Sequence, residues 1–280
     1  MFLNKKLVLG SCVTLLIVIF FVAVNFLLSP TTDIADKADK KKFLETNICT
    51  ECNLHNLNLK FAQLAGAKLT NANLKGVNFS RADLSGADLS GASLIGANFA
   101  NAIMTNINLT NANLTKSDLN NVFMKGAIAT KAIFISANLE QANLEGADLA
   151  LSDFSEAHMP KATLISANLK ETIFGNANLS SAKLTGATMK RSMIQHANLE
   201  STNLEGADLE GASLEGARLY RARLQRANLK NSNLTNSDLR KTNIMAATID
   251  GANLGGTNLS EARWIDGRKC LPESIGICAE

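Results

Sequence analysis

Residues 82–99 read ADLSG ADLSG ASLIG ANF, a five-residue unit that recurs through most of the 280-residue chain. We call the Leu or Phe position of each unit i. An apolar residue stands at i in residue 54 and at every fifth residue up to 264, which makes 43 consecutive units in one register. Position i is Leu in 29 of the 43 units, and position i−2 is Ala in 29. This strict spacing predicts that both positions face one common interior.

A period of five residues fits neither a regular helix nor a single straight strand. Around an α-helix each fifth residue rotates by about 140°, so the Leu side chains would not share a face. In a straight strand an odd period would place successive Leu side chains on opposite faces. A short extended piece from i−2 to i, followed by a bend at i+1 and i+2, keeps both positions inward. Position i+2 is rich in Gly, Asn and Ser, which suit such a bend. The pattern therefore predicts an all-β solenoid wound around a narrow core.

The tandem A-[DN]-L-x-x units resemble those of the pentapeptide-repeat protein family, over about residues 52–264. The resemblance implies a right-handed quadrilateral β-helix with four units per coil, in which i and i−2 fill the interior. With 43 units this gives nearly eleven coils. At ~4.8 Å between stacked strands the rod would be roughly 50 Å long. The ends, CTECNL from residue 49 and WIDGRKC from residue 264, resemble a membrane-anchored or exported subgroup with cysteine-containing end caps.

Composition favours one elongated domain rather than two globular ones. Apolar residues make up 46% of the chain, aromatic residues only 5%, and the formal net charge is +3. So few aromatic residues do not suit a wide globular core. A narrow core suits Leu and Ala, since each buried Leu stabilises the fold by roughly 1.5–3 kcal/mol.

The N-terminal region before the repeats predicts a membrane attachment. A short basic tail at residues 1–6 precedes Leu7 to Leu28, a segment of 22 residues without a charge. As a helix this segment would be about 33 Å long, enough to cross a bilayer. We expect a retained transmembrane anchor, and a cleaved signal peptide is the alternative. Residues 29–48 then read as a polar linker, 49–266 as the repeat domain and 267–280 as a C-terminal cap.

The cysteines outside the anchor lie at the two ends of the repeats. Cys49 and Cys52 precede the first unit, and Cys270 and Cys278 follow the last. The two pairs would be too far apart to share a disulfide or a zinc site, so we expect each to act locally as a structural disulfide that caps a terminal coil. Lysines flank the anchor on both sides, so charge does not decide its orientation. The cysteines place the repeat domain on the periplasmic or extracytoplasmic side.

The repeats offer little that predicts catalysis. His55, His158 and His196 stand singly at outward positions, so they form neither a metal site nor a triad. Asp and Glu are numerous, but many of them fill position i−1, where Asn and Asp are the usual residues. The C-x-x-C of Cys49 and Cys52 lacks the βαβ context of a redox motif. We therefore expect no enzyme activity, no cofactor and no metal.

Charged residues twenty apart should stack on neighbouring coils. This spacing predicts cross-coil pairs in two columns: Lys190, Glu210, Lys230 and Asp250 in one, Arg218 and Asp238 in another. The basic run at Arg218, Arg221, Arg223 and Arg226 has acidic residues close by in sequence. We interpret it as a mixed-charge surface, and we expect no nucleic-acid partner.

Apolar residues at outward positions form a candidate interaction patch. They occupy i−1 or i+1 of their units: Ile103, Phe123, Ile128, Ile133, Ile135, Ile173 and Met193. The alternative is a local irregularity around Ala129, the smallest residue at any position i.

These observations favour a non-enzymatic, membrane-tethered scaffold that binds a protein or envelope component, or a second copy of itself, through its outer faces. The resemblance offers an alternative, because some pentapeptide-repeat proteins mimic DNA and protect a topoisomerase. That role would need a strongly acidic rod. Residues 53–266 carry 20 Lys and Arg against 18 Asp and Glu, which disfavours it. A dithiol enzyme that uses Cys49 and Cys52 is the third hypothesis.

Overall fold

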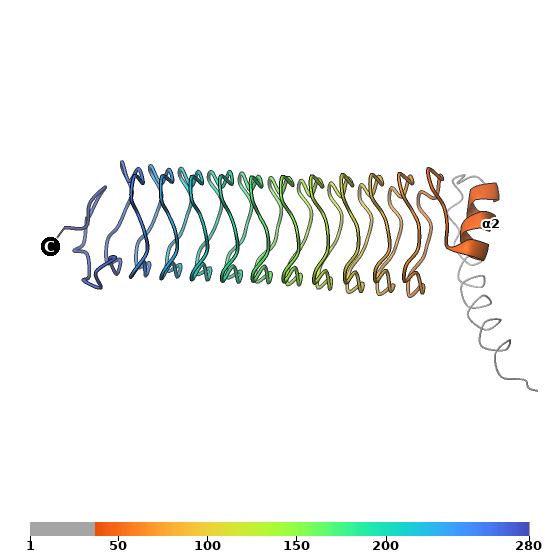
Figure 1. Cartoon of the computed structure of the whole chain (residues 1–280), viewed down its shortest axis with the longest axis horizontal. Coiled ribbons are helices and arrows are strands. Elements are labelled where there is room, and N and C mark those ends of the chain that lie inside the picture. Colours follow the sequence, from red (N-terminus) through yellow and green to blue (C-terminus); the bar gives the residue numbers. More distant parts are fainter. Residues whose placement is uncertain (1–36, 280) are drawn as a thin grey trace, which may run out of the picture.

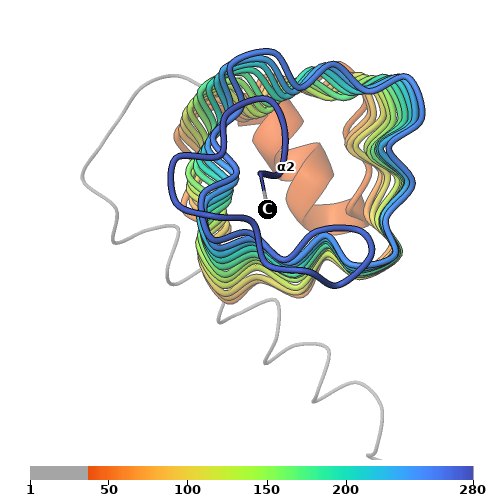
Figure 2. The same ribbon diagram turned by 90° about the vertical axis from the view of Figure 1, so that its left-hand side faces the viewer.

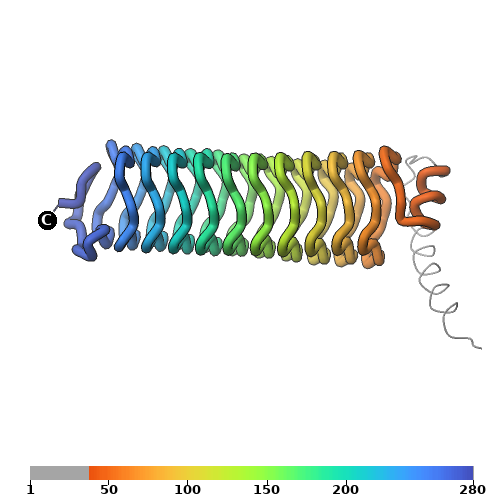
Figure 3. Tube along the Cα trace, viewed as in Figure 1, coloured from red at the N-terminus to blue at the C-terminus, as the bar shows by residue number. Residues whose placement is uncertain are grey.

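The computed structural model describes residues 37–279 and shows one straight, coiled rod (Figures 1 and 3). Parallel β-bridges join residues twenty apart, from Ile48 with Lys68 to Asn243 with Arg263. Twenty residues are four five-residue units, so each coil has four sides. The view along the axis in Figure 2 shows this four-sided outline. The solenoid expected from the sequence is confirmed.

Each unit turns in the same way, as Leu84 illustrates. The N–H of Ala87 donates to the carbonyl of Leu84 at 3.0 Å, which closes a four-residue turn. Position i+2 of that turn is Gly86, with φ of +63°. A type II turn requires a positive φ there. The Oδ1 atom of Asp83, at i−1, accepts the N–H of Ser85 at 2.9 Å and fixes the corner.

The core is a narrow column of side chains at i and i−2. Nearly all of these side chains are fully buried between the first and last coils. Phenylalanines at i stack on neighbouring coils, and the rings of Phe134 and Phe154 lie 4.5 Å apart between centroids. Ala129 is also buried, and its neighbour Ile128 keeps the regular bridge to Asp148. The local irregularity considered around Ala129 is therefore absent.

One expectation about the linker is wrong. Helix α2 (Lys37–Thr46) occupies much of the expected polar linker and lies across the N-terminal end of the rod. Phe43 from α2 is buried against the first coil, and the carboxylate of Asp39 accepts the N–H of Asn53 at 2.8 Å. A terminal coil exposes one side of the core, and the ring of Phe43 covers it. The residues around Phe43 are mostly polar, so composition did not indicate this capping role.

The expected transmembrane anchor, Leu7 to Leu28, lies outside the described residues. Within residues 37–279 no helix has the length and apolar character needed to cross a bilayer.

At the C-terminal end, residues 267–279 leave the parallel pattern. They pair back onto the last coil by antiparallel bridges, between Asn258 and Ile275 and between Arg263 and Lys269. Figure 2 shows these residues crossing part of the end of the rod.

Candidate functional site

The three histidines lie far apart on the outside of the rod. Nδ1 of His55 lies 2.8 Å from Oδ1 of Asn53, and His158 contacts the side chain of Asn178 on the next coil. His196 is exposed at a turn position with φ of +57°. No two of these residues share a coil, so they do not form a common site.

Potential metal ligands gather at the N-terminal end, where the ligand atoms of Asp39, Cys49 and Cys52 lie within 4.8 Å of one another. The two sulfur atoms are bonded to each other as a disulfide. Asp39 is engaged with the backbone of Asn53. A disulfide offers no thiolate to a metal ion, so this cluster serves to fasten the end of the rod.

The second cysteine pair, Cys270 and Cys278, is bonded at the opposite end of the rod. Both sulfur-bearing side chains are buried there. Each disulfide therefore lies within one end cap, and neither connects the two ends.

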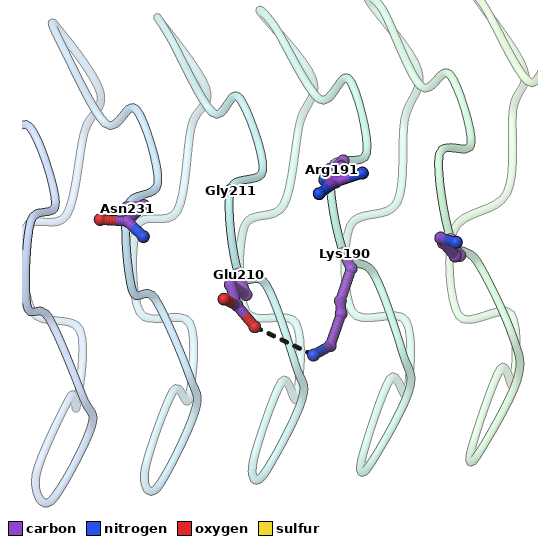
Figure 4. Close-up of a pocket in the computed structure, with 6 residues that line it drawn as sticks. Lys190, Arg191, Glu210, Gly211 and Asn231 are labelled. Carbon is purple, nitrogen blue, oxygen red and sulfur yellow. Dashed lines mark hydrogen bonds and ion pairs between the residues drawn. The ribbon is translucent and has the colours of Figure 1, made fainter.

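A shallow hollow of about 460 Å³ lies on one corner of the rod (Figure 4). Lys190 Nζ lies 2.9 Å from Glu210 Oε2 and 3.2 Å from Asp208 Oδ2. The hydrogen bonds that the Lys190 ammonium donates to Glu210 and then to Asp208 raise the pKa of Lys190. Arg191 faces Glu171 at 4.0 Å. Lys170 also lines the hollow, and Glu171 lies 3.6 Å from its Nζ, so the three cations of the hollow each have a carboxylate nearby.

The predicted charge columns are only partly correct. The cross-coil pair of Lys190 and Glu210 is confirmed. Arg218 and Asp238 stack on neighbouring coils as predicted, but their closest partners are others: Arg218 pairs with Glu200, and Asp238 pairs with Arg240 at 2.7 Å. Arg240 is two residues from Asp238 and meets the same turn, so it reaches the carboxylate more easily than a side chain on another coil.

The basic run has acidic partners of its own. Arg223 pairs with Glu205 at 3.0 Å, as Arg218 does with Glu200. Tyr220, the only tyrosine of the chain, lies among further cations, and the nearest, Arg221, is 5.1 Å from its ring centroid. This surface is of mixed charge, as interpreted from the sequence.

The seven apolar residues of the candidate interaction patch do not form one surface. Ile103 and Phe123 are bridged neighbours on one side, and Ile128 follows on the next side. Another side carries Ile133, Ile173 and Met193, of which the last two are bridged neighbours. Ile135 lies at a corner between sides. The twenty-residue period decides this division, and sorting the residues by that period would have revealed it in advance.

Several exposed apolar residues lie outside the candidate patch, and two of them occupy a turn position of the repeat. Phe61 and Leu151 are about half exposed at position i+2, where both have a positive φ. Lys60 and Arg81 lie over the Phe61 ring, at 5.1 and 5.6 Å from its centroid. The signal was available in the sequence, because position i+2 is otherwise occupied mainly by Gly and polar residues.

Four-sided coils with a side-chain core and outward turns define a β-solenoid. The family described as Pentapeptide repeats matches eight copies along residues 52–91, 92–128, 132–170, 162–200, 194–231 and 222–261. The chain belongs to this family. Membership implies the right-handed quadrilateral β-helix, and members are generally non-enzymatic structural or binding proteins.

Solved structures with this kind of repeat are also similar to the chain. HetL, a pentapeptide repeat protein involved in heterocyst differentiation regulation from Nostoc sp. strain PCC 7120, is 28% identical. The match covers 79% of this chain and 91% of HetL, with a TM-score of 0.34. Full-length QnrB1, a plasmid-mediated fluoroquinolone resistance protein, is 19% identical over 73% of this chain and 92% of its own, with a TM-score of 0.33. No curated protein matches the chain.

Proposed function

We propose that the protein is a non-enzymatic scaffold, tethered to a membrane by Leu7 to Leu28, whose outer faces bind a protein or envelope component. One observation carries the binding role: Ile103, Phe123 and Ile128 are large apolar residues exposed on the walls of a regularly bonded rod. Exposed apolar groups of this kind mark interaction surfaces.

The regular backbone makes these walls suitable for binding. The N–H of Phe123 donates to Ala102 on the preceding coil at 3.0 Å, and the N–H of Ile128 donates to Ile107 at 2.9 Å. The backbone of such a wall is already ordered, so a partner binds with little cost for ordering the main chain.

The cysteines support an extracytoplasmic position for the rod. Two disulfides, one in each end cap, suit an oxidising compartment. Mass analysis of the native protein with and without reductant would test this proposal and the tether together. We expect a full-length chain whose mass increases by four hydrogen atoms on reduction, two for each disulfide. A mature chain that begins after residue 28 would exclude the tether.

The binding role is tested by capture from native membranes. The full-length protein is crosslinked in place, and the captured proteins are compared between the natural chain and two variants. One carries Ile103→Asn, Phe123→Asn and Ile128→Asn, and the other carries Ile173→Asp and Met193→Asp. We expect a captured component to be lost from at least one variant. Identical capture by both folded variants would contradict the proposed function.

The DNA-mimic alternative receives little support from the surface. Acidic side chains such as Glu200, Glu205 and Glu210 are paired with Arg or Lys, so they do not form a continuous acidic stripe. A gyrase supercoiling assay discriminates the two roles, and we expect no specific effect of the protein.

A further inference from the structure

Three exposed apolar side chains form a group that we call the Phe123 patch: Ile103, Phe123 and Ile128. They are 45, 52 and 48% exposed. Ile103 and Phe123 are joined by a parallel β-bridge, so their side chains emerge from adjacent coils. Ile128 occupies the same position of the next unit, around one corner of the same coil as Phe123.

The corner between Phe123 and Ile128 leaves the patch uncovered. Gly126 occupies its tip with φ of +66° and has no side chain. The other corner residue, Lys125, is directed to Glu145 on the next coil at 2.9 Å. The apolar groups on the two sides are therefore separated by a corner at which Gly126 adds no side chain of its own and the Asn106 side chain of the neighbouring coil lies close by.

Carboxylates surround the patch on both sides. Asp83 is bridged to Ile103, and Asp148 is bridged to Ile128. Asp88 lies on the same side as Ile128, two coils earlier, and Asn108 lies between them. Cations also lie near the patch: Lys125 is paired with Glu145, Lys131 follows Ile128 by three residues, and Lys68 is bridged to Asp88. Between residues 81 and 151, the carboxylates on these two sides and their corners outnumber the cations, so the rim is net acidic: Asp83, Asp88, Glu140, Glu145 and Asp148 against Arg81, Lys125 and Lys131.

Asp88 keeps its charge over the ordinary pH range. Burial acts to raise the pKa of Asp88, but hydrogen bonds from the Ser90 side chain and backbone and from Thr70, together with the charge of Lys68, lower it overall. Thr70 Oγ1 lies 3.3 Å from Asp88 Oδ2. A partner that approaches this rim meets ionised carboxylates.

We propose that the Phe123 patch binds a cationic amphipathic segment of a partner protein, with apolar side chains on Ile103, Phe123 and Ile128 and Lys or Arg against the acidic rim. This inference rests on the proposed scaffold function and names the class of its partner. An apolar centre with a polar rim of complementary charge is the usual composition of a specific protein interface.

The net acidic rim also disfavours two other occupants. The same patch of a second copy would bring Asp83, Asp88 and Asp148 against an equally acidic rim, which is unfavourable. An anionic lipid surface would be repelled for the same reason. A basic partner segment is the occupant that satisfies both the apolar centre and the rim.

The test uses the full-length protein in neutral detergent and two fluorescent peptides of equal length. One alternates Leu with Lys to give an amphipathic cationic segment, and the other carries Glu in place of Lys. Fluorescence anisotropy is recorded at low and at physiological salt. We expect the Leu/Lys peptide to bind and the Leu/Glu peptide not to bind.

Matched variants locate the site. The patch variant carries Ile103→Asn, Phe123→Asn and Ile128→Asn, and it should fold because Asn is a usual residue at this position of the repeat, as Asn108 and Asn143 show. We expect it to bind the Leu/Lys peptide at least about tenfold more weakly. The rim variant, Asp83→Asn with Asp148→Asn, should bind several-fold more weakly and depend less on salt.

The control variant carries Ile173→Asn and Met193→Asn on another side of the rod, and it should bind the Leu/Lys peptide as the natural chain does. The inference is overturned if the patch variant binds equally well, if the Leu/Glu peptide binds as tightly, or if neither peptide binds. It is also overturned if sedimentation shows a dimer that the patch variant loses, because the occupant is then a second copy. If membrane capture depends on Ile173 and Met193 alone, the scaffold function stands while this inference fails.

Discussion

The two ends of the rod cover the apolar core in different ways. Every coil in the middle is covered on both sides by neighbouring coils, whereas a terminal coil exposes one side of the core. At the N-terminal end, α2 lies across the opening and Phe43 is only 1% exposed. Asp39 and the Cys49–Cys52 disulfide fasten this helix region to the first coil.

The C-terminal end has no helix in the described part of the chain. Its cap pairs with the last coil at Asn258 and Arg263, but Ile249, Ala252 and Leu254 remain partly exposed. Within residues 37–279 the backbone N–H groups of Ile249 and Leu254 have no hydrogen-bond acceptor, although equivalent groups in earlier coils are bonded to the next coil. The comparison shows that a helix with one aromatic ring covers the solenoid core more completely than a short irregular segment does.

The largest expected effect concerns the N-terminal helix. Phe43→Ala should lower the free energy of unfolding by about 3–5 kcal/mol, because it opens a cavity above the first coil. Chemical denaturation measures the loss, and hydrogen exchange should show faster exchange near residues 49–66 first. Phe61→Ala removes an exposed phenylalanine and is the control. Uniform exchange along the whole rod would show that α2 does not act as a local cap.

Removing the disulfides should affect the C-terminal end more strongly. In the chain-entropy account the bridge between Cys270 and Cys278 closes a longer loop, so Cys270→Ser with Cys278→Ser should cost about 2.5 kcal/mol, against about 1.8 kcal/mol for Cys49→Ser with Cys52→Ser. The N-terminal variant also keeps α2 in place through Phe43. Limited proteolysis should therefore cleave the C-terminal variant first, near residues 267–279. Earlier cleavage of the N-terminal variant would reverse the comparison.

A smaller effect is expected at the partly exposed core of the last coil. Leu254→Ala should cost about 1 kcal/mol, whereas Leu149→Ala in a fully covered coil should cost about 2–5 kcal/mol. The two variants remove the same atoms from the same position i, so only the covering differs. Denaturation midpoints measure both, and equal losses would show that the C-terminal cap covers Leu254 as well as a coil covers Leu149.

The repeating part of the fold could be predicted almost completely from the sequence. A single apolar spacing fixed the inward positions, and the Gly and Asn residues at i+2 indicated the turns. The ends could not be predicted in the same way, because they lack the period. Phe43 lies in a polar, lysine-rich segment whose helical state depends on packing against the first coil, and composition alone indicated a solvated linker.

The candidate site was predicted less well than the fold. The outward apolar residues were recognised as exceptions to the repeat, but only the four-sided geometry separates Ile103 and Phe123 from Ile173 and Met193. The partners in the ion pairs were predicted least well. The partner of Asp238 depends on side-chain reach within one turn, and a rule based on residues twenty apart does not contain that information.

The smallest expected effect is a pH-dependent change in stability from the ion pair of Asp238 and Arg240, near the C-terminal end of the rod. Burial acts to raise the pKa of Asp238, but hydrogen bonds from the side chain and backbone of Arg240 outweigh it and lower the pKa below the usual value. The stabilisation is therefore present above the unfolded-state pKa of about 3.9 and is lost as pH falls through the lower folded-state value. Because Arg240 is half exposed, we expect Asp238→Asn to cost less than about 1 kcal/mol at neutral pH. Urea midpoints should show this difference shrinking on acidification and at high salt.

The control is Asp153→Asn, which keeps the turn hydrogen bond and removes no ion pair seen in residues 37–279. Its effect on stability should be smaller and should not depend on salt concentration. A difference for Asp238→Asn that grows as pH falls would show that the ion pair with Arg240 does not stabilise this coil.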